Sequence, residues 1–279
     1  MALYQRDDEL YLPTGATRGP WDANAQNGGA VSALVATAAV LHDQAGAPRL
    51  DEHILARLTV DLVRPVPLTP LSVTTSTVRP GRKVQLVEVL VHAGEEVVTR
   101  ALGLRMPATH PDVVASAEAP PAFLGADTAL SPAPAREPGE ELFHMDGAEV
   151  RTHRRGEERP VPVPIWVRLT QEVVEGEPTL PAARALAAAD FGSGLSGIAG
   201  PGWRSINVDV DVHLFRLPVG GWVCYLARSQ GAAGVGLAGG PLYDTHGPIG
   251  HAQQSVLVEP WAGSFPPRAG GPESDPRST

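Results

Sequence analysis

Hydrophobic and polar positions alternate along several segments of the chain, and each half also contains one helical stretch. In the first half, alternating runs at 55–63, 71–78, 84–92 and 97–106 predict four strands. Before them, at 31–41, apolar residues recur at helical spacing with small side chains between them, and Gly46 is the expected stop. A helix that is small-sided all round is usually enclosed by other elements. The first half is therefore predicted to be one central helix followed by an antiparallel meander.

The second half repeats this order after a proline- and alanine-rich stretch at 107–140 that predicts a linker. Alternation predicts strands at 143–153, 163–169, 206–215, 222–229 and 249–258. An alanine-rich helix is predicted from 182 to about 191, with Pro181 as its first residue. Residues 234–239 have dinucleotide-like glycine spacing, but no βαβ unit surrounds them, so they are interpreted as a flexible turn or bulged strand.

Two anchors indicate that the chain is duplicated. Arg64 and Arg216 close similar alternating segments 152 positions apart, and Gly94 and Gly247 lie in predicted hairpin turns 153 positions apart. At the second offset, Ala101 of the first copy is predicted to correspond to Gln254 of the second. A polar residue in one copy and an apolar one in the other suggest one working site and one supporting half.

Composition and charge exclude several classes of protein. Of the 279 residues, 43% are hydrophobic and 19% charged, which is typical of a folded protein. The net charge of −9 argues against non-specific nucleic-acid binding. A single cysteine, Cys224, excludes an internal disulfide framework, and its apolar neighbours predict that it is buried. The polar N-terminus and the lack of a long apolar run predict a cytoplasmic protein without a membrane span.

Two further patterns are weak candidates for chemistry. Asn207, Asp209, Asp211 and His213 are predicted to share one face of a strand, and their side chains are of the kind that bind metals. One strand alone makes a poor chelate, so no metal site is expected. Ser196 lies in a sequence that lacks the last glycine of a nucleophile elbow, which disfavours a serine hydrolase.

Several motifs, in their order and spacing, resemble the type II acyl-CoA thioesterase family, which has a double hotdog fold. The motifs are residues 27–30, 62–65, 78–82, 186–190 and 243–250, together with Gln254. The resemblance implies an α+β fold of two hotdogs in tandem, with two antiparallel sheets each wrapped around a central helix. The expected organisation is an N-terminal hotdog at 1–107, a linker at 108–140, a C-terminal hotdog at 141–260 and a disordered tail at 261–279.

The resemblance also implies an activity, the hydrolysis of fatty acyl-CoA by water that an Asp, a Thr or Ser, and a Gln activate. It places the Asp at Asp190, the Gln at Gln254 and the hydroxyl at Asn207. The last is a departure, because an amide can hold water but cannot replace a hydroxyl in a proton relay. From the residues alone, Asp190 ends an apolar helix, where burial would raise its pKa and suit a general base. No cofactor is expected.

Candidate binding residues are less specific. Gly28 and Gly29 begin the first helix, where backbone N–H groups could stabilise an oxyanion. Arg79, Arg82 and Lys83 are candidates for binding the phosphates of coenzyme A, with a solvated turn as the alternative.

Two other functions remain open. One is an acyl-thioester binding or assembly protein of the same fold, which the asparagine at 207 favours. The other is an enoyl-thioester hydratase or dehydratase, for which His251 is the histidine in the most convincing register. A homodimer or larger homo-oligomer is expected, because the edges of hotdog sheets commonly pair.

Overall fold

The fold was analysed in a computed structural model of the chain, which describes residues 1–42, 53–108, 118–125, 140–153, 161–197 and 202–261. The first half contains β1 (Ala2–Asp7), β2 (Leu10–Pro13), α1 (Gly28–Leu41), β3 (His53–Asp61), β4 (Leu71–Arg79), β5 (Gln85–Ala93) and β6 (Glu96–Pro107). The second half contains β7 (Ala148–Thr152), β8 (Val163–Leu169), β9 (Glu172–Val174), α2 (Pro181–Ala189), α3 (Gly192–Leu195), β10 (Trp203–Asn207), β11 (Asp209–Leu214), β12 (Val223–Ala232), β13 (Val235–Asp244) and β14 (Gly247–Pro260).

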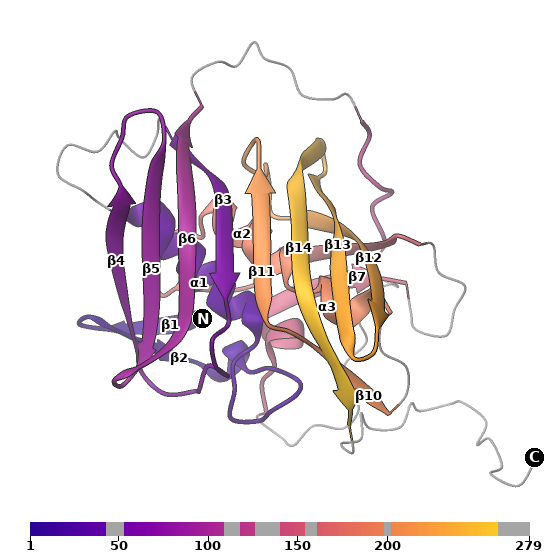
Figure 1. Cartoon of the computed structure of the whole chain (residues 1–279), viewed down its shortest axis with the longest axis horizontal. Coiled ribbons are helices and arrows are strands. Elements are labelled where there is room, and N and C mark those ends of the chain that lie inside the picture. Colours follow the sequence, from indigo (N-terminus) through magenta and orange to yellow (C-terminus); the bar gives the residue numbers. More distant parts are fainter. Residues whose placement is uncertain (43–52, 109–117, 126–139, 154–160, 198–201, 262–279) are drawn as a thin grey trace, which may run out of the picture.

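All the described strands belong to one sheet, in the order β7-β8-β12-β13-β14-β11-β3-β6-β5-β4-β2-β1-β9, with β10 paired to β14. From β7 to β1 this order is symmetric about the middle. Counted inwards from one end, the second half contributes β7, β8, β12, β13, β14 and β11, and counted inwards from the other, the first half contributes the equivalent strands β1, β2, β4, β5, β6 and β3. The two halves lie side by side in Figure 1, and β3 and β11 are neighbours at the middle. The two separate sheets expected from the sequence are therefore joined into one by the pairing of β3 with β11.

The centre of this internal symmetry lies between Thr59 of β3 and Asp211 of β11. These residues are 152 positions apart, they are directly opposite each other in the antiparallel register, and the Thr59 hydroxyl donates a 2.8 Å hydrogen bond to Asp211. The flanking pairs are Leu58 with Val212 and Val60 with Val210. The structure thus confirms the offset that the arginines at 64 and 216 indicated, because each half contributes the same strand to the junction.

The second predicted offset is wrong. The hairpin between β5 and β6 closes with Ala93 opposite Glu96, and the hairpin between β13 and β14 closes with Asp244 opposite Gly247. Gly247 therefore corresponds to Glu96 rather than to Gly94. Gly94 has a φ of 62° within its turn, whereas Gly247 has a φ of 141° at the first residue of its strand, so the two turns use glycine at different positions.

The predicted correspondence of Ala101 with Gln254 is wrong for the same reason. The cross-strand pairs are Val60 with Ala101 and Val212 with Ala252. Because Val60 and Val212 are equivalent, Ala101 corresponds to Ala252. Two residues further along the strand, Gln254 then corresponds to Gly103.

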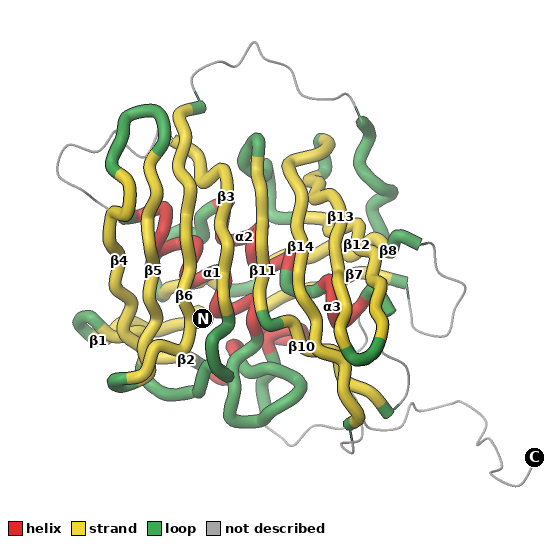
Figure 2. The backbone as a smooth tube through the Cα atoms, viewed as in Figure 1, coloured by secondary structure: helices red, strands yellow, loops and turns green. Residues whose placement is uncertain are grey.

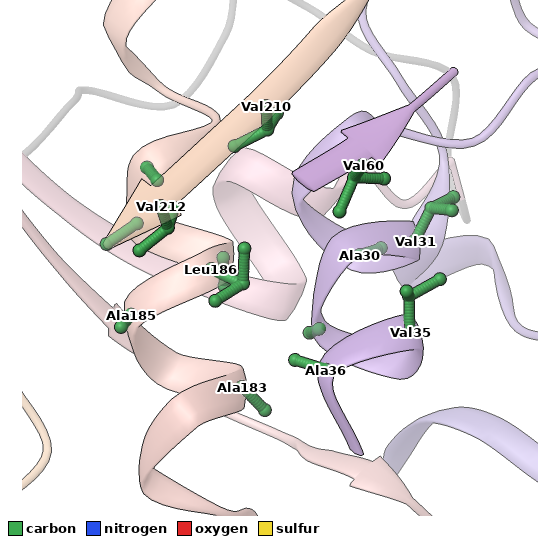
Figure 3. Packing of buried hydrophobic residues seen from close by; sticks show 14 of the residues in the cluster. Ala30, Val31, Val35, Ala36, Val60, Ala183, Ala185, Leu186, Val210 and Val212 are labelled. Atoms are coloured by element: carbon green, nitrogen blue, oxygen red, sulfur yellow. The ribbon is translucent and has the colours of Figure 1, made fainter. Parts of the chain in front are cut away.

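The two helices lie behind the long strands of the sheet, as the tube in Figure 2 shows. Helix α1 begins at an N-cap, Asn27, whose side chain accepts a 2.8 Å hydrogen bond from the Gly29 N–H, and α2 begins with Pro181 at its first turn. The helices pack side by side through small residues such as Ala36 and Ala183, under valines of β3 and β11 (Figure 3). Their alanine-rich sequences therefore favour the helix itself and allow its close approach to the other helix.

Several elements differ from the sequence predictions. Strands β1 and β2 lie in a polar segment that did not predict structure, and of the glycine-rich run interpreted as a turn or a bulged strand, residues 235–239 belong to β13. Residues Phe143–Gly147 form a helical turn instead of beginning a strand. The predicted strand at 206–215 is divided by a bulge into β10 and β11. The predicted helix stop, Gly46, and the tail beyond 261 lie outside the described residues.

Part of the predicted linker, residues 118–125, lies against the second half. The ring of Phe123 contacts Trp166 and Trp222 with centroid distances of 5.0 and 5.1 Å. The Trp166 indole N–H donates to the carbonyl of Ala122, and the Tyr243 hydroxyl donates to Glu118. This segment is therefore packed on β8, β12 and β13. Among the described residues, no helix is long and apolar enough to cross a membrane.

Candidate active site

Asp190 is the residue at which the buried helix α2 ends. It caps the helix in a helical conformation, and α3 begins two residues later. Only 7% of Asp190 is exposed, and this burial raises the pKa of its carboxyl group to about 6. Hydrogen bonds from the Asn207 side chain and the Gly29 N–H oppose part of that rise. The prediction of a buried carboxyl with a raised pKa is confirmed, and near neutral pH such a group can accept a proton.

Asn207 points at this carboxyl group because of the bulge between β10 and β11. The partners of Asn207 and Val212 on β14 are four positions apart, whereas Asn207 and Val212 are themselves five positions apart, so the strand contains one extra residue, at Val208. The Asn207 Nδ2 donates a 2.7 Å hydrogen bond to Asp190 Oδ1. The prediction that Asn207 shares a face with Asp211 is therefore wrong, since the bulge turns Asn207 towards the helices.

Gln254 lies on β14, next to the point where α2 and α3 meet. Its Nε2 donates a 3.1 Å hydrogen bond to the backbone carbonyl of Asp190, and its Oε1 accepts a 2.9 Å bond from the backbone N–H of Ser193. Gln254 is 1% exposed. A Cβ built on Gly192 would lie 2.8 Å from Gln254 Oε1 and would collide with a ring carbon of Tyr225, so only glycine fits at this position. Asp190, Asn207 and Gln254 thus form one connected cluster.

Gly28 and Gly29 bring the start of α1 to the same carboxyl group. A Cβ built on Gly28 would collide with Asp190 Oδ1 and lie 3.2 Å from its carboxyl carbon. The N–H of Gly29 is already used, because it donates to Asn27 Oδ1 and also contributes to the pKa of Asp190. The N–H of Gly28, at the first position of the helix, has no acceptor within the helix and can serve a ligand.

Ser193 is a member of the cluster that the sequence analysis missed. Besides its backbone bond to Gln254, its Oγ lies 3.5 Å from Asn207 Oδ1, and its carbonyl accepts a 3.0 Å bond from the Ser205 hydroxyl. Ser193 is 4% exposed. Ser193 follows Asp190 by three positions, a spacing that places two residues on the same face of a helix, and this was the only sequence signal for its role. The glycines on both sides of it suggested only the end of a helix.

The equivalent place in the first half is apolar. The register gives Leu55 as the counterpart of Asn207 and Gly103 as the counterpart of Gln254. A Cβ built on Gly103 would lie 3.1 Å from Leu55 and 3.3 Å from Ala39. The first half also has a bulge at this point, between Leu55 and Arg57. The backbone is thus repeated, and the polar side chains are found only in the second half.

A buried ion pair holds the hairpin that leads into β14. Arg216 donates to both carboxylate oxygens of Asp244, at 2.5 and 2.8 Å, and Asp244 also accepts from the backbone N–H groups of Val219, His246 and Gly247. Burial alone would raise the pKa of Asp244, but these hydrogen bonds lower it to about 2. The pair stabilises the segment that positions Gln254.

The predicted basic residues lie elsewhere. Arg79, Arg82 and Lys83 are exposed at the turn between β4 and β5, where the Arg82 carbonyl contacts His53 at the start of β3. Gly28 and Asp190 instead lie near Leu62, just beyond the other end of β3. Nine strand residues span roughly 30 Å, so the structure does not bring this turn to the carboxyl group.

The outer face of the sheet holds the other polar candidates. His251 is exposed and lies opposite His213, on the face of β14 away from Gln254. Asp209 accepts hydrogen bonds from Ser255, and Asp211 accepts one from Thr59. Cys224, by contrast, is buried as predicted, and burial raises the pKa of its thiol to about 12. It is therefore a poor nucleophile.

Two domain families match the sequence, one in each half. The N-terminal domain of the acyl-CoA thioesterases matches residues 17–106, and the C-terminal domain matches residues 116–258. The second match includes the whole cluster around Asp190, and the two together span most of the chain. A comparison with curated proteins gives no significant match.

Solved structures with the same fold cover nearly the whole chain. A TesB protein from Mycobacterium avium subsp. paratuberculosis is 20% identical with a TM-score of 0.65, covering 92% of this chain and 96% of its own. An acyl-CoA thioesterase II from Mycobacterium marinum is 18% identical with a TM-score of 0.59, covering 93% and 95%. A hot dog fold protein from Alicyclobacillus acidocaldarius is 20% identical with a TM-score of 0.67, covering 92% and 95%. These likenesses confirm the tandem hotdog fold.

Proposed function

The chain belongs to the acyl-CoA thioesterase family and is a thioester hydrolase, and from this premise we propose that Asp190 is its general base. The proposed reaction is hydrolysis of a fatty acyl-CoA to the free fatty acid and coenzyme A. The observation that supports it most is a buried carboxyl group with a pKa of about 6, contacted by an amide side chain and a helix N-terminus. Such a group is ionised at neutral pH and basic enough to deprotonate water.

In the proposed first step, water attacks the carbonyl carbon of the thioester while Asp190 accepts a proton from that water. A tetrahedral intermediate forms, and its oxygen carries the negative charge. The carbon–sulfur bond then breaks, and the protonated Asp190 returns the proton to the leaving sulfur. The products are a carboxylic acid and the thiol of coenzyme A, and Asp190 is again ionised.

The other residues hold the reacting groups in place. Each side-chain amide nitrogen has two protons, and Asn207 and Gln254 each use one of them on Asp190. We assign the remaining proton of Gln254 to the attacking water. The free N–H of Gly28, at the positive end of α1, is assigned to the developing oxyanion. Removing one donor of this kind typically lowers a rate by about 10²–10³-fold.

Two observations bear on the alternative functions. A hydratase or dehydratase of this fold pairs Asp with His, but His251 lies on the outer face of the sheet and no histidine is among the groups that shift the pKa of Asp190. Asn207 in the place of the family's hydroxyl is the feature that favoured a non-catalytic binding protein, and the match of both halves to thioesterase domains favours hydrolysis instead. Location in the cytoplasm and assembly into a homo-oligomer stay predictions from the sequence.

The test is a panel of saturated acyl-CoA substrates of increasing chain length, with an enoyl-CoA added, incubated with the purified chain. Free thiol is measured with a thiol-reactive dye, and enoyl absorbance is followed in parallel. We expect thiol release with saturating kinetics for at least one chain length. Saturable acyl-CoA binding without thiol release at any length would instead support the binding protein, and loss of enoyl absorbance would support the hydratase.

A further inference from the structure

Both amide side chains of the cluster must present nitrogen, not oxygen, towards Asp190. An amide group can be oriented either way, and its partners on both sides decide which orientation is stable. An ionised carboxylate and a backbone carbonyl accept hydrogen bonds only, so they favour the nitrogen. What lies on the oxygen side of each amide therefore decides how firmly the nitrogen is held.

A single residue, Ser193, lies on the oxygen side of both amides. Its backbone N–H donates to Gln254 Oε1 at 2.9 Å, and its hydroxyl oxygen is 3.5 Å from Asn207 Oδ1. On their other sides, Gln254 Nε2 and Asn207 Nδ2 donate to the carbonyl and carboxyl oxygens of Asp190. Two chains of hydrogen bonds thus begin at Ser193 and end at Asp190.

Resting on the proposed function of Asp190, we infer that Ser193 is a positioning residue whose hydroxyl orients the Asn207 amide and so stabilises the ionised form of the catalytic carboxyl group. The hydroxyl can donate to Asn207 Oδ1, and this bond polarises the amide so that its nitrogen donates more strongly to Asp190. A helix turn after Asp190 thereby supplies the hydroxyl that the strand position 207 lacks.

The local structure fixes Ser193 in this place. Its carbonyl accepts a 3.0 Å bond from Ser205, which is 2% exposed, and Gly192 before it packs against Tyr225 and Gln254 without room for a side chain. The main chain cannot turn the serine away without breaking these contacts. Burial, the Asn207 amide and the Gly29 N–H account for the pKa of Asp190, and no charged side chain is among its causes. Changes in the Asn207 amide should therefore be visible in the titration of Asp190.

The experiment compares the pH dependence of kcat/KM for thioester hydrolysis in the wild-type chain, Ser193→Ala and Ser255→Ala. The alanine at 193 removes the hydroxyl but keeps the backbone N–H that holds Gln254. Ser255→Ala removes a hydroxyl next to Gln254 on the outer face of β14, where it donates to Asp209. We expect the acid limb to move to higher pH by about 0.5–1 unit in Ser193→Ala, and to stay in place in Ser255→Ala.

An acid limb at the wild-type position in Ser193→Ala, or an equal shift in both variants, would overturn the inference. In the wild-type chain, the side-chain amide resonances of Asn207 should also titrate with an apparent pKa near that of Asp190, and their failure to do so would overturn it too. Failure of the proposed function is recognised separately, because Asp190→Asn would then remain active. Loss of activity in Asp190→Asn with no shift in Ser193→Ala contradicts the inference alone.

Discussion

The two halves of this chain share a backbone and differ in the few side chains that can do chemistry. Each half has a buried helix, a strand with a bulge at the equivalent residue, and a meander completing its part of the sheet. At the bulge, the first half places Leu55 beside Gly103, and the second places Asn207 and Gln254 beside Asp190. The comparison shows that a buried helix and a bulged strand alone do not make the site, because the apolar half has both.

A second difference concerns how each half holds its hairpin. In the second half, Arg216 and Asp244 form a bidentate ion pair whose carboxylate is fully buried. In the first half, the corresponding Arg64 is 3.9 Å from Glu96, and both side chains are mostly exposed. The half that carries the cluster around Asp190 is also the half whose hairpin is held by an ion pair with a buried carboxylate.

The largest expected difference between the halves is in stability. Asp244→Asn leaves Arg216 without its carboxylate, and we expect the free energy of unfolding to fall by about 3 kcal/mol. Glu96→Gln, the matched change in the exposed pair, should cost less than about 1 kcal/mol. Urea unfolding measures both, and equal losses would contradict the comparison.

The pH dependence of the free energy of unfolding tests the ion pair of Arg216 and Asp244 in a second way. The folded pKa of Asp244, about 2, is below the unfolded value of roughly 3.9. The stability that this group contributes is therefore fully present above pH ~4 and is lost as the pH falls towards 2. In the Asp244→Asn variant, the free energy of unfolding should not include this contribution and should therefore fall less as the pH is lowered.

The next effect concerns the approach of α1 to Asp190. Gly28→Ala places a methyl group against the carboxyl group, and we expect kcat/KM to fall by about 10²-fold because the base is displaced. Gly194→Ala is the control, since a Cβ there meets nothing within 4 Å although the residue lies in α3 beside the cluster. A Gly28→Ala variant as active as Gly194→Ala would show that the contact has no role in catalysis.

A smaller effect is expected when Asn207 is replaced by leucine, the residue at the equivalent position of the first half. Asn207→Leu copies Leu55 and removes the hydrogen bond that lowers the pKa of Asp190 from the value that burial alone would give. The acid limb of kcat/KM, expected near pH 6 in the wild type, should move up by about one unit. Gln253→Leu, on the outer face of β14, should leave the limb where it is. An unmoved limb in Asn207→Leu would mean that the amide does not control the base.

Much of the fold could be predicted from the sequence. Alternation located most of the long strands, and the spacing of Arg64 and Arg216 gave the offset that the pairing of Thr59 with Asp211 confirms. For the glycine-rich run in β13 the sequence left a turn or a bulged strand open, because its residues lack the branched side chains that mark a strand, and its stability comes from two neighbouring strands. The pairing of β3 with β11 is a long-range contact, which local patterns do not show.

The site was predicted in part. Asp190, Asn207 and Gln254 were named from the resemblance, and the structure places them in contact, although their catalytic roles remain a proposal. Ser193 was missed, because only the packing of α3 against β10 and β14 brings it to the two amides. The bulge at Val208 also has no sequence signature, since the side chains around it alternate regularly.

The most direct test of the account is thioester hydrolysis by Asp190→Asn, compared with Asp211→Asn. Both replace a carboxylate by an amide of the same shape, one inside the second half and one on the outer face of the sheet at the internal symmetry centre. We expect Asp190→Asn to lower kcat by about 10³-fold or more while thermal melting and acyl-CoA binding persist, and Asp211→Asn to keep wild-type activity. Wild-type rates of thiol release in Asp190→Asn would contradict the claim that the Asp190 carboxyl group is the general base and that the second half carries the active site.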